Sequence, residues 1–163
     1  MSPTPPNTNL PIRKRETIVE AAKRVFLREG YGANMDAVAG EAGVSKQTVY
    51  NHFGSKEALF VAIVEELSAD LLGSLDDADR LLADPRRGLT RFGLRFLKTV
   101  LAPESVALHR MLVAEAPRFP DLAREVFERG PARTASRLAA LLAEADRRGL
   151  LRIDDPLGAA ERF

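Results

Sequence analysis

The sequence predicts an all-α fold, with a head of three short helices followed by a longer helical body. Three observations support this prediction. Ala, Glu, Lys, Leu and Arg make up about half of the 163 residues, a composition that favours helices. Apolar residues recur along the chain at the spacing of amphipathic helices. Finally, no stretch of more than four residues resembles a β-strand.

Composition excludes several classes of protein. The chain has no cysteine, which excludes disulfides, thiolate zinc sites and iron–sulfur clusters. Its longest strictly apolar stretch, residues 58–64, is far shorter than the roughly 20 residues that span a bilayer. Residues 1–11 lack the basic start and apolar centre of a signal peptide, so we interpret them as a disordered lead. We therefore expect a cytoplasmic protein with no cofactor, no metal and no membrane partner.

The first predicted helix covers residues 13–29. Its apolar residues form one stripe with helical spacing, and Gly30 ends it. The stripe consists of Ile18, Ala21, Ala22, Val25 and Phe26. Basic residues outnumber acidic ones over the first 56 residues, while the rest of the chain is slightly acidic. A net positive charge on this N-terminal segment is expected in a protein that binds a polyanion.

Two short helices are predicted next, over 35–42 and 46–53. Each lies between a capping residue and a glycine: Asn34 and Gly43 bound the first, and Ser45 and Gly54 bound the second. Ser55 then caps a longer helix, in which apolar residues keep helical spacing as far as Leu72.

Prolines mark the starts of the helices in the body. A proline at the first helical position follows Asp84 and, further on, Asp155, which is a common arrangement at helix starts. The Gly130-Pro131 pair predicts a kink or break in the longest of these helices. The expected helices cover 85–101, 106–116, 122–148 and 156–163, and the last ends after about two turns. The body therefore looks truncated at its C-terminus.

Residues 35–50 have the pattern of a helix-turn-helix. Small residues allow the two helices to approach each other, and Gly43 permits the turn between them. In such a motif the second helix enters the major groove of DNA. Its first turn carries Lys46, Gln47 and Thr48, whose side chains suit guanine, adenine and the thymine methyl group. The alternative for this spacing is two short helices in an ordinary helical core.

The residues around this motif closely resemble the signature of TetR-family regulators. The matching runs are Ile18-Val19-Glu20-Ala21-Ala22, Phe26 to Tyr31, Met35-Asp36-Ala37-Val38-Ala39, Ala42 to Lys46 and Val49 to Phe60. Segments 114–123 and 130–133 are similar to the C-terminal domain type named for AefR. The resemblance implies an N-terminal helix-turn-helix DNA-binding domain (12–56) and a C-terminal helical ligand-binding and dimerisation domain (57–163).

The resemblance also implies roles for individual residues. Positions that face bases in the family fall on Lys46, Gln47 and Tyr50, with Thr48 beside them. Positions that contact phosphates fall on Asn51, His52 and Lys56, although the family commonly has an aromatic residue where this chain has Asn51. His52 is interpreted as a packed or phosphate-facing residue rather than as a metal ligand. Arg13, Lys14 and Arg15 could reach an adjacent phosphate or the minor groove.

The implied function is that of a ligand-responsive transcriptional regulator, in most members a repressor. It binds a near-palindromic operator as a homodimer and is released by a small-molecule effector. Aromatic and methionine side chains suit an adaptable apolar pocket, although each can equally belong to the core. The candidate ligand-binding residues are Phe92, Phe96, His109, Met111, Phe119 and Phe127.

Two other functions remain as alternatives. A DNA-associated or protein-binding adaptor on the same fold would have no small-molecule switch. An enzyme is not expected, because the chain lacks a nucleophilic cysteine and shows no Ser–His–acid arrangement. The densest acidic group consists of Asp76, Asp77 and Asp79, which by itself is a weak indication of a metal site.

Overall fold

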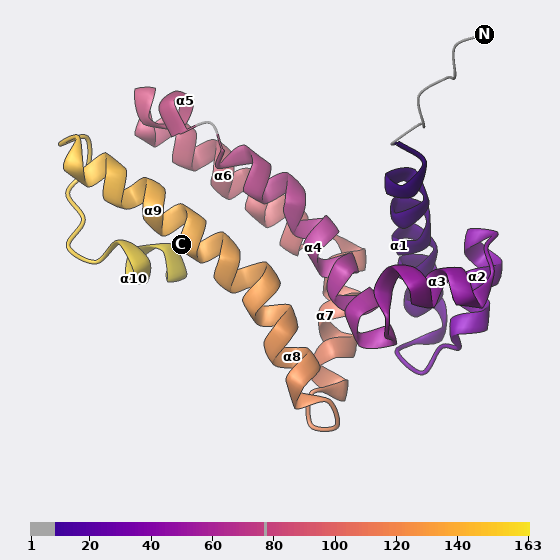
Figure 1. Ribbon diagram of the computed structural model, residues 1–163. Coiled ribbons are helices and arrows are strands. Elements are labelled where there is room, and N and C mark those ends of the chain that lie inside the picture. Colours follow the sequence, from indigo (N-terminus) through magenta and orange to yellow (C-terminus); the bar gives the residue numbers. More distant parts are fainter. Residues whose placement is uncertain (1–8, 77) are drawn as a thin grey trace, which may run out of the picture. The chain divides into compact units, whose positions relative to one another are not determined.

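The protein is described by a computed structural model that places residues 9–76 and 78–163. Over these residues the chain forms helices joined by short turns, with no strand among them (Figure 1). The predicted all-α class is therefore confirmed. The chain divides into two compact units, one ending at Ile63 and the other running from Val64 to Phe163. Residues 1–8 of the expected disordered lead, as well as Asp77, lie outside the described residues.

The first unit contains α1 (Asn9–Glu29), α2 (Met35–Ala42), α3 (Lys46–Phe53) and the start of α4 (Lys56–Ser74). The bounds of α2 and α3 agree with the prediction, whereas α1 begins four residues before the predicted start at residue 13. The N-caps predicted for α2 and α3 both form. The Asn34 side chain accepts a hydrogen bond from the backbone N–H of Asp36 (3.0 Å), and Ser45 Oγ accepts one from that of Thr48 (3.1 Å).

An aromatic cluster lies in the core of the first unit. The rings of Phe26, Tyr31 and Phe60 have centroids 5.6 to 6.1 Å apart, and the Tyr31 and Phe60 rings meet edge to face. Fully buried aliphatic residues from α1, α2 and α3 complete this core, namely Ile18, Val25, Val38 and Val49. The core therefore fixes the positions of the long helix α1 and the two short helices α2 and α3.

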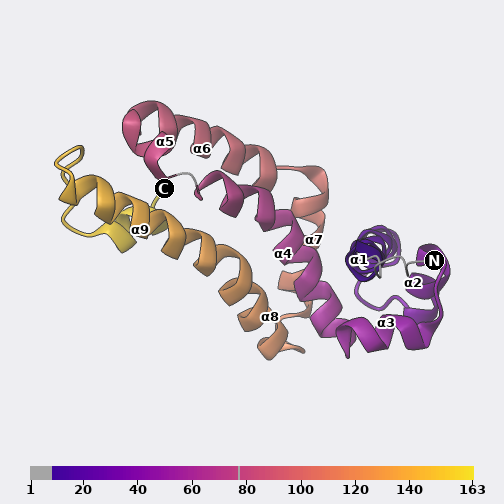
Figure 2. The ribbon, with the colours of Figure 1, turned by 45° about the horizontal axis from the view of Figure 1, so that its top comes forward.

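The second unit contains the rest of α4 and the remaining helices, from α5 to α10 (Figure 2). The helices that follow α4 are α5 (Ala78–Ala83), α6 (Pro85–Val100), α7 (Pro103–Glu115), α8 (Pro120–Phe127), the π-helix η1 (Glu128–Ala132), α9 (Arg133–Arg147) and α10 (Pro156–Glu161). Helix α10 packs against α9. The sequence did not predict α5, a six-residue helix that is held by tertiary packing, since its Leu81 and Leu82 are buried.

The break predicted at Gly130-Pro131 takes the form of one π-helical turn between α8 and α9. Proline has no N–H to continue the α-helical hydrogen bonds, and a π-turn accommodates the missing donor without ending the helix. The Thr134 hydroxyl donates to the Gly130 carbonyl (3.1 Å), which satisfies one of the backbone groups at the turn.

The core of the second unit combines α5, α6, α9 and α10 with Leu75, which directly follows α4. It is built mainly from Leu75, Leu81, Leu82, Phe92, Leu138, Leu141, Leu142, Ala145 and Ala160. Gly88 allows α5 and α6 to pack closely, because a Cβ atom at this position would lie 2.7 Å from the Leu81 carbonyl oxygen. None of the described helices combines the length and the apolar character that crossing a membrane requires.

Candidate DNA-binding and ligand-binding sites

Helix α3 presents an almost entirely polar surface to solvent. Val49 is its one buried residue, and it anchors the helix in the core of the first unit. Five of the seven candidate DNA-binding residues are exposed on α3: Lys46, Gln47, Tyr50, Asn51 and His52. Thr48 is half-buried, and its hydroxyl lies 2.8 Å from that of the capping Ser45. The side chains of this helix are therefore available to a partner along one face.

The turn between α2 and α3 is a Schellman motif. Gly43 adopts a left-handed conformation with φ of 67°. The backbone N–H of Val44 donates to the Ala39 carbonyl (3.0 Å), and that of Gly43 donates to the Gly40 carbonyl (3.2 Å). This geometry ends α2 and starts α3 within a few residues, as a helix-turn-helix requires.

Lys46 is held in an exposed ion pair with Asp36 of α2. The Lys46 Nζ atom lies 2.9 Å from Asp36 Oδ2. This hydrogen bond, together with the negative charge of Asp36, raises the pKa of the Lys46 ammonium group above its ordinary value. To contact a base, Lys46 must break its ion pair with Asp36. Exposed ion pairs are weak enough for this to happen.

Gln47 and Asn51 form a hydrogen-bonded pair on the exposed face of α3. Gln47 Nε2 donates to Asn51 Oδ1 at 2.8 Å, with the two residues one helical turn apart. An aromatic residue at position 51 has no amide oxygen and could not accept this bond. The departure from the family pattern at Asn51 thus has a local consequence, because it orients the side chain expected to read a base. The i, i+4 spacing places the two amides within reach of each other, but it does not determine the rotamers that form the bond.

Lys56 stabilises the loop between α1 and α2. Its ammonium group donates to the Ala33 carbonyl (2.7 Å) and lies 4.9 Å from the centre of the Tyr31 ring. The Tyr31 hydroxyl in turn donates to Glu57 Oε1 (3.2 Å). Lys56 is half-buried, so it has a structural role in addition to the phosphate contact predicted for it.

Charged side chains also connect α1 to the two helices of the motif. Arg24 of α1 donates to Glu41 of α2 at 2.9 Å, and this bond lowers the pKa of the Glu41 carboxyl group. The Arg15 guanidinium lies 5.3 Å from the centre of the Phe53 ring, at the C-terminal end of α3. The start of α1 therefore brings a basic side chain next to the helix that carries His52.

An apolar cavity of about 520 Å³ lies in the second unit, within the size range of small-molecule sites. Three of the six candidate ligand-binding residues, Phe92, Phe96 and Phe127, line it. Phe92 is buried in the core, whereas 60% of Phe127 is exposed. The other lining residues include Thr134, Ser136, Leu138, Leu157, Glu161 and Phe163.

The remaining three candidates lie elsewhere in the second unit. His109 is exposed on α7, Met111 is half-buried on the same helix, and Phe119 precedes α8 beside the guanidinium of Arg118. None of them lines the apolar cavity.

In the acidic group, Asp76 pairs with Arg137 (3.0 Å) and Asp79 with Arg148 (3.4 Å), so both described carboxylates have cationic partners.

Family models match both units of the chain. Residues 18–63 match the model for bacterial regulatory proteins of the tetR family. Residues 87–163 match the model for the C-terminal domain of AefR-like transcriptional repressors. The first match contains the helix-turn-helix, and the second contains α6 except for its first two residues, together with every residue that lines the apolar cavity.

Similar proteins of known structure cover nearly the whole chain. A structure described as a TetR-family transcriptional regulator from Mesorhizobium loti is 33% identical, with a TM-score of 0.77, over 91% of this chain and 76% of that one. The flavonoid-responsive regulator FrrA is 37% identical, with a TM-score of 0.67, over 93% of this chain and 77% of that one.

Curated relatives extend further than this chain does. The transcriptional regulator BetI of Rhizobium meliloti is 33% identical over 116 residues, which are 70% of this chain and 57% of BetI. The chain spans about a third to just over half the length of the first curated relatives it matches.

Proposed function

Because the chain belongs to the TetR family of bacterial regulators, we propose that it regulates transcription by binding a near-palindromic operator as a homodimer. The observation that carries this proposal is the polar face of α3, which is exposed and fixed by the Schellman turn at Gly43. A helix presented in this way fits the major groove of DNA. The matched family and the relatives named above consist of regulators, in agreement with the prediction that the chain is not an enzyme.

We assign base contacts to Lys46, Gln47 and Tyr50, with Thr48 beside them. Their exposure supports this assignment for all except Thr48, whose hydroxyl is shared with the helix cap. Phosphate contacts fall to Asn51, His52 and Lys56. The working domains are the DNA-binding head, 12–56, and the ligand-binding and dimerisation body, 57–163.

The proposed regulator is a repressor that acts in the cytoplasm and is released from DNA when it binds a small molecule. The match of residues 87–163 to AefR-like repressors supports repression, and the flavonoid-responsive relative supports control by a ligand. Phe92, Phe96 and Phe127 are the candidate contacts for the apolar part of an effector, since they line the cavity of about 520 Å³. His109, Met111 and Phe119 remain weaker candidates.

Fluorescence anisotropy tests operator binding. Labelled duplexes that tile the DNA around the chain's own gene are titrated with the protein at several salt concentrations. We expect saturable binding to one near-palindromic duplex, falling steeply as salt rises. Binding that is equally weak to every duplex would contradict a sequence-specific regulator.

Gln47→Ala tests the assigned readout on the duplex found in this way. Loss of a bidentate contact reduces discrimination at one base pair by about 1–3 kcal/mol. Lys98→Ala, which removes an exposed charge from α6 in the second unit, serves as a control and should leave discrimination unchanged. Unaltered discrimination by Gln47→Ala would remove Gln47 from the readout.

A ligand screen separates a switchable repressor from an adaptor without a switch. A compound that raises the melting temperature and lowers operator affinity supports the repressor. If no compound in a broad apolar library changes either quantity, the adaptor becomes the better description of the chain.

A further inference from the structure

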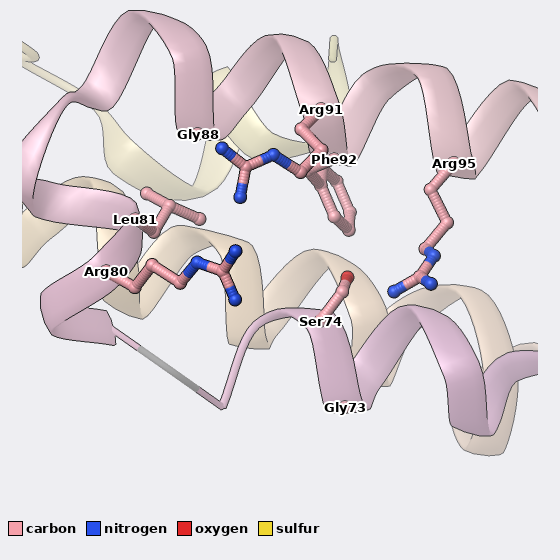
Figure 3. A pocket seen from close by; sticks show the side chains of 8 residues that line it. All are labelled: Gly73, Ser74, Arg80, Leu81, Gly88, Arg91, Phe92 and Arg95. Carbon is pink, nitrogen blue, oxygen red and sulfur yellow. The ribbon is translucent and has the colours of Figure 1, made fainter.

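A second cavity of the second unit is lined by three arginines (Figure 3). Its volume is about 460 Å³, and it lies between the C-terminal part of α4, α5 and α6. The residues that line it are Gly73, Ser74, Arg80, Leu81, Gly88, Arg91, Phe92 and Arg95. None of the three arginines stands out in the sequence, because each is unremarkable on its own helix.

Close packing of two helices brings these arginines around one space. Arg91 and Arg95 are one turn apart on α6, and Arg80 is on α5. Figure 3 shows the guanidinium groups of Arg91 and Arg80 turned toward each other and that of Arg95 reaching toward Ser74. Gly88 permits this arrangement, because any side chain there would collide with the Leu81 backbone.

Arg91 and Arg95 bring positive charge to the cavity that the described carboxylates balance weakly or not at all. Asp70 is the acidic partner of Arg95, but the two side chains are 4.0 Å apart and Asp70 is 83% exposed. Across the described part of the chain, no carboxylate lies within ion-pair distance of Arg91. Helix α6 itself carries five basic residues and no acidic one. Arg80, Arg91 and Arg95 are all exposed, so solvent and salt screen the repulsion between them, but an anion bound among them gains charge-assisted hydrogen bonds.

We propose that this arginine cavity binds an oxyanion, a phosphate or carboxylate group carried by a small-molecule ligand. The planar guanidinium forks of Arg91 and Arg95 match the geometry of both groups, and the guanidinium of Arg80 faces that of Arg91. Phe92 lines this cavity and the apolar one, so one residue borders both candidate ligand sites. The proposal that an oxyanion binds here rests on the proposed function in one respect: it takes the bound molecule to be the effector of the regulator.

Isothermal titration of the whole chain with pyrophosphate and, separately, with citrate tests the proposal. The two probes distinguish a phosphate from a carboxylate ligand, and sodium chloride keeps the ionic strength constant. Saturable binding of either probe is expected. Arg91→Ala and Arg95→Ala should each weaken that binding about tenfold or more, the effect of losing a charge-assisted hydrogen bond.

Arg86→Ala is the matched control. Arg86 is on the same helix and is exposed, but it does not line the arginine cavity, so its removal should change affinity less than about twofold. An equal loss of affinity in Arg86→Ala and Arg91→Ala would overturn the proposal, as would the absence of saturable binding by both probes. The titration contains no DNA, so its failure is distinguishable from a failure to find an operator.

Discussion

Replacing Gly43 by alanine is expected to destabilise the first unit by about 1–2 kcal/mol, the cost of placing an L-residue in the left-handed conformation. Gly43 has φ of 67°, and an added Cβ would meet no atom within 4 Å. The whole cost is therefore conformational, with no collision to relieve. Asparagine tolerates this region better, so Gly43→Asn should cost less than Gly43→Ala.

Gly40 provides a matched control, because the same substitution there is expected to change stability in the opposite direction. It lies inside α2, three residues before Gly43, and an added Cβ there also meets no atom within 4 Å. Alanine is favoured over glycine in a helix interior, so Gly40→Ala should stabilise the unit by about 0.5–1 kcal/mol. The same chemical change thus has opposite effects at two positions of one short segment.

Urea unfolding followed by tyrosine fluorescence measures these differences in the whole chain. The chain has two tyrosines and no tryptophan, and Tyr31 and Tyr50 both belong to the first unit. The fluorescence signal therefore reports on that unit alone. If Gly43→Ala and Gly40→Ala shift the midpoint in the same direction, or if Gly43→Asn is less stable than Gly43→Ala, the account of the turn is wrong.

Three further predictions concern surface residues. Asp36→Asn removes the ion pair of Lys46 and should tighten operator binding about two- to fivefold in anisotropy titrations. Weaker binding by this variant would show instead that Asp36 positions Lys46 for DNA. The pKa of Glu41 is lowered in the fold by Arg24, so its contribution to stability is present at neutral pH and is lost as the pH falls below the ordinary value of 4.5. Glu41→Gln should therefore lower the melting temperature at pH 7 and lose this effect in acid, whereas a difference independent of pH would exclude the ionised carboxylate as its cause. Phe127→Ala should change the free energy of unfolding by no more than about 0.5 kcal/mol, because 60% of the residue is exposed. The same substitution should weaken binding of the neutral dye N-phenyl-1-naphthylamine to the apolar cavity that Phe127 lines. Unchanged dye binding would remove Phe127 from the apolar site.

The first unit could be predicted closely because its signals are local. Asn34, Gly43 and Ser45 determine the ends of helices through hydrogen bonds and backbone conformations that involve only nearby residues. The exposed positions of α3 follow from helical periodicity once Val49 is known to face the core. In contrast, the pairing of Gln47 with Asn51 depends on the choice of rotamers, which no spacing rule determines.

In the second unit the sequence determined most helix boundaries, through prolines and caps, but not the cavities between the helices. Helix α5 escaped prediction because six residues carry too little periodicity, and its stability comes from burying Leu81 and Leu82. Only the tertiary structure separated Phe92, Phe96 and Phe127, which line one cavity, from the other candidates. Likewise, it alone brought Arg80 to the same cavity as two arginines of α6. The physical reason is the range of the interactions: caps and periodicity act over one or two turns, whereas a cavity depends on how closely separate helices pack.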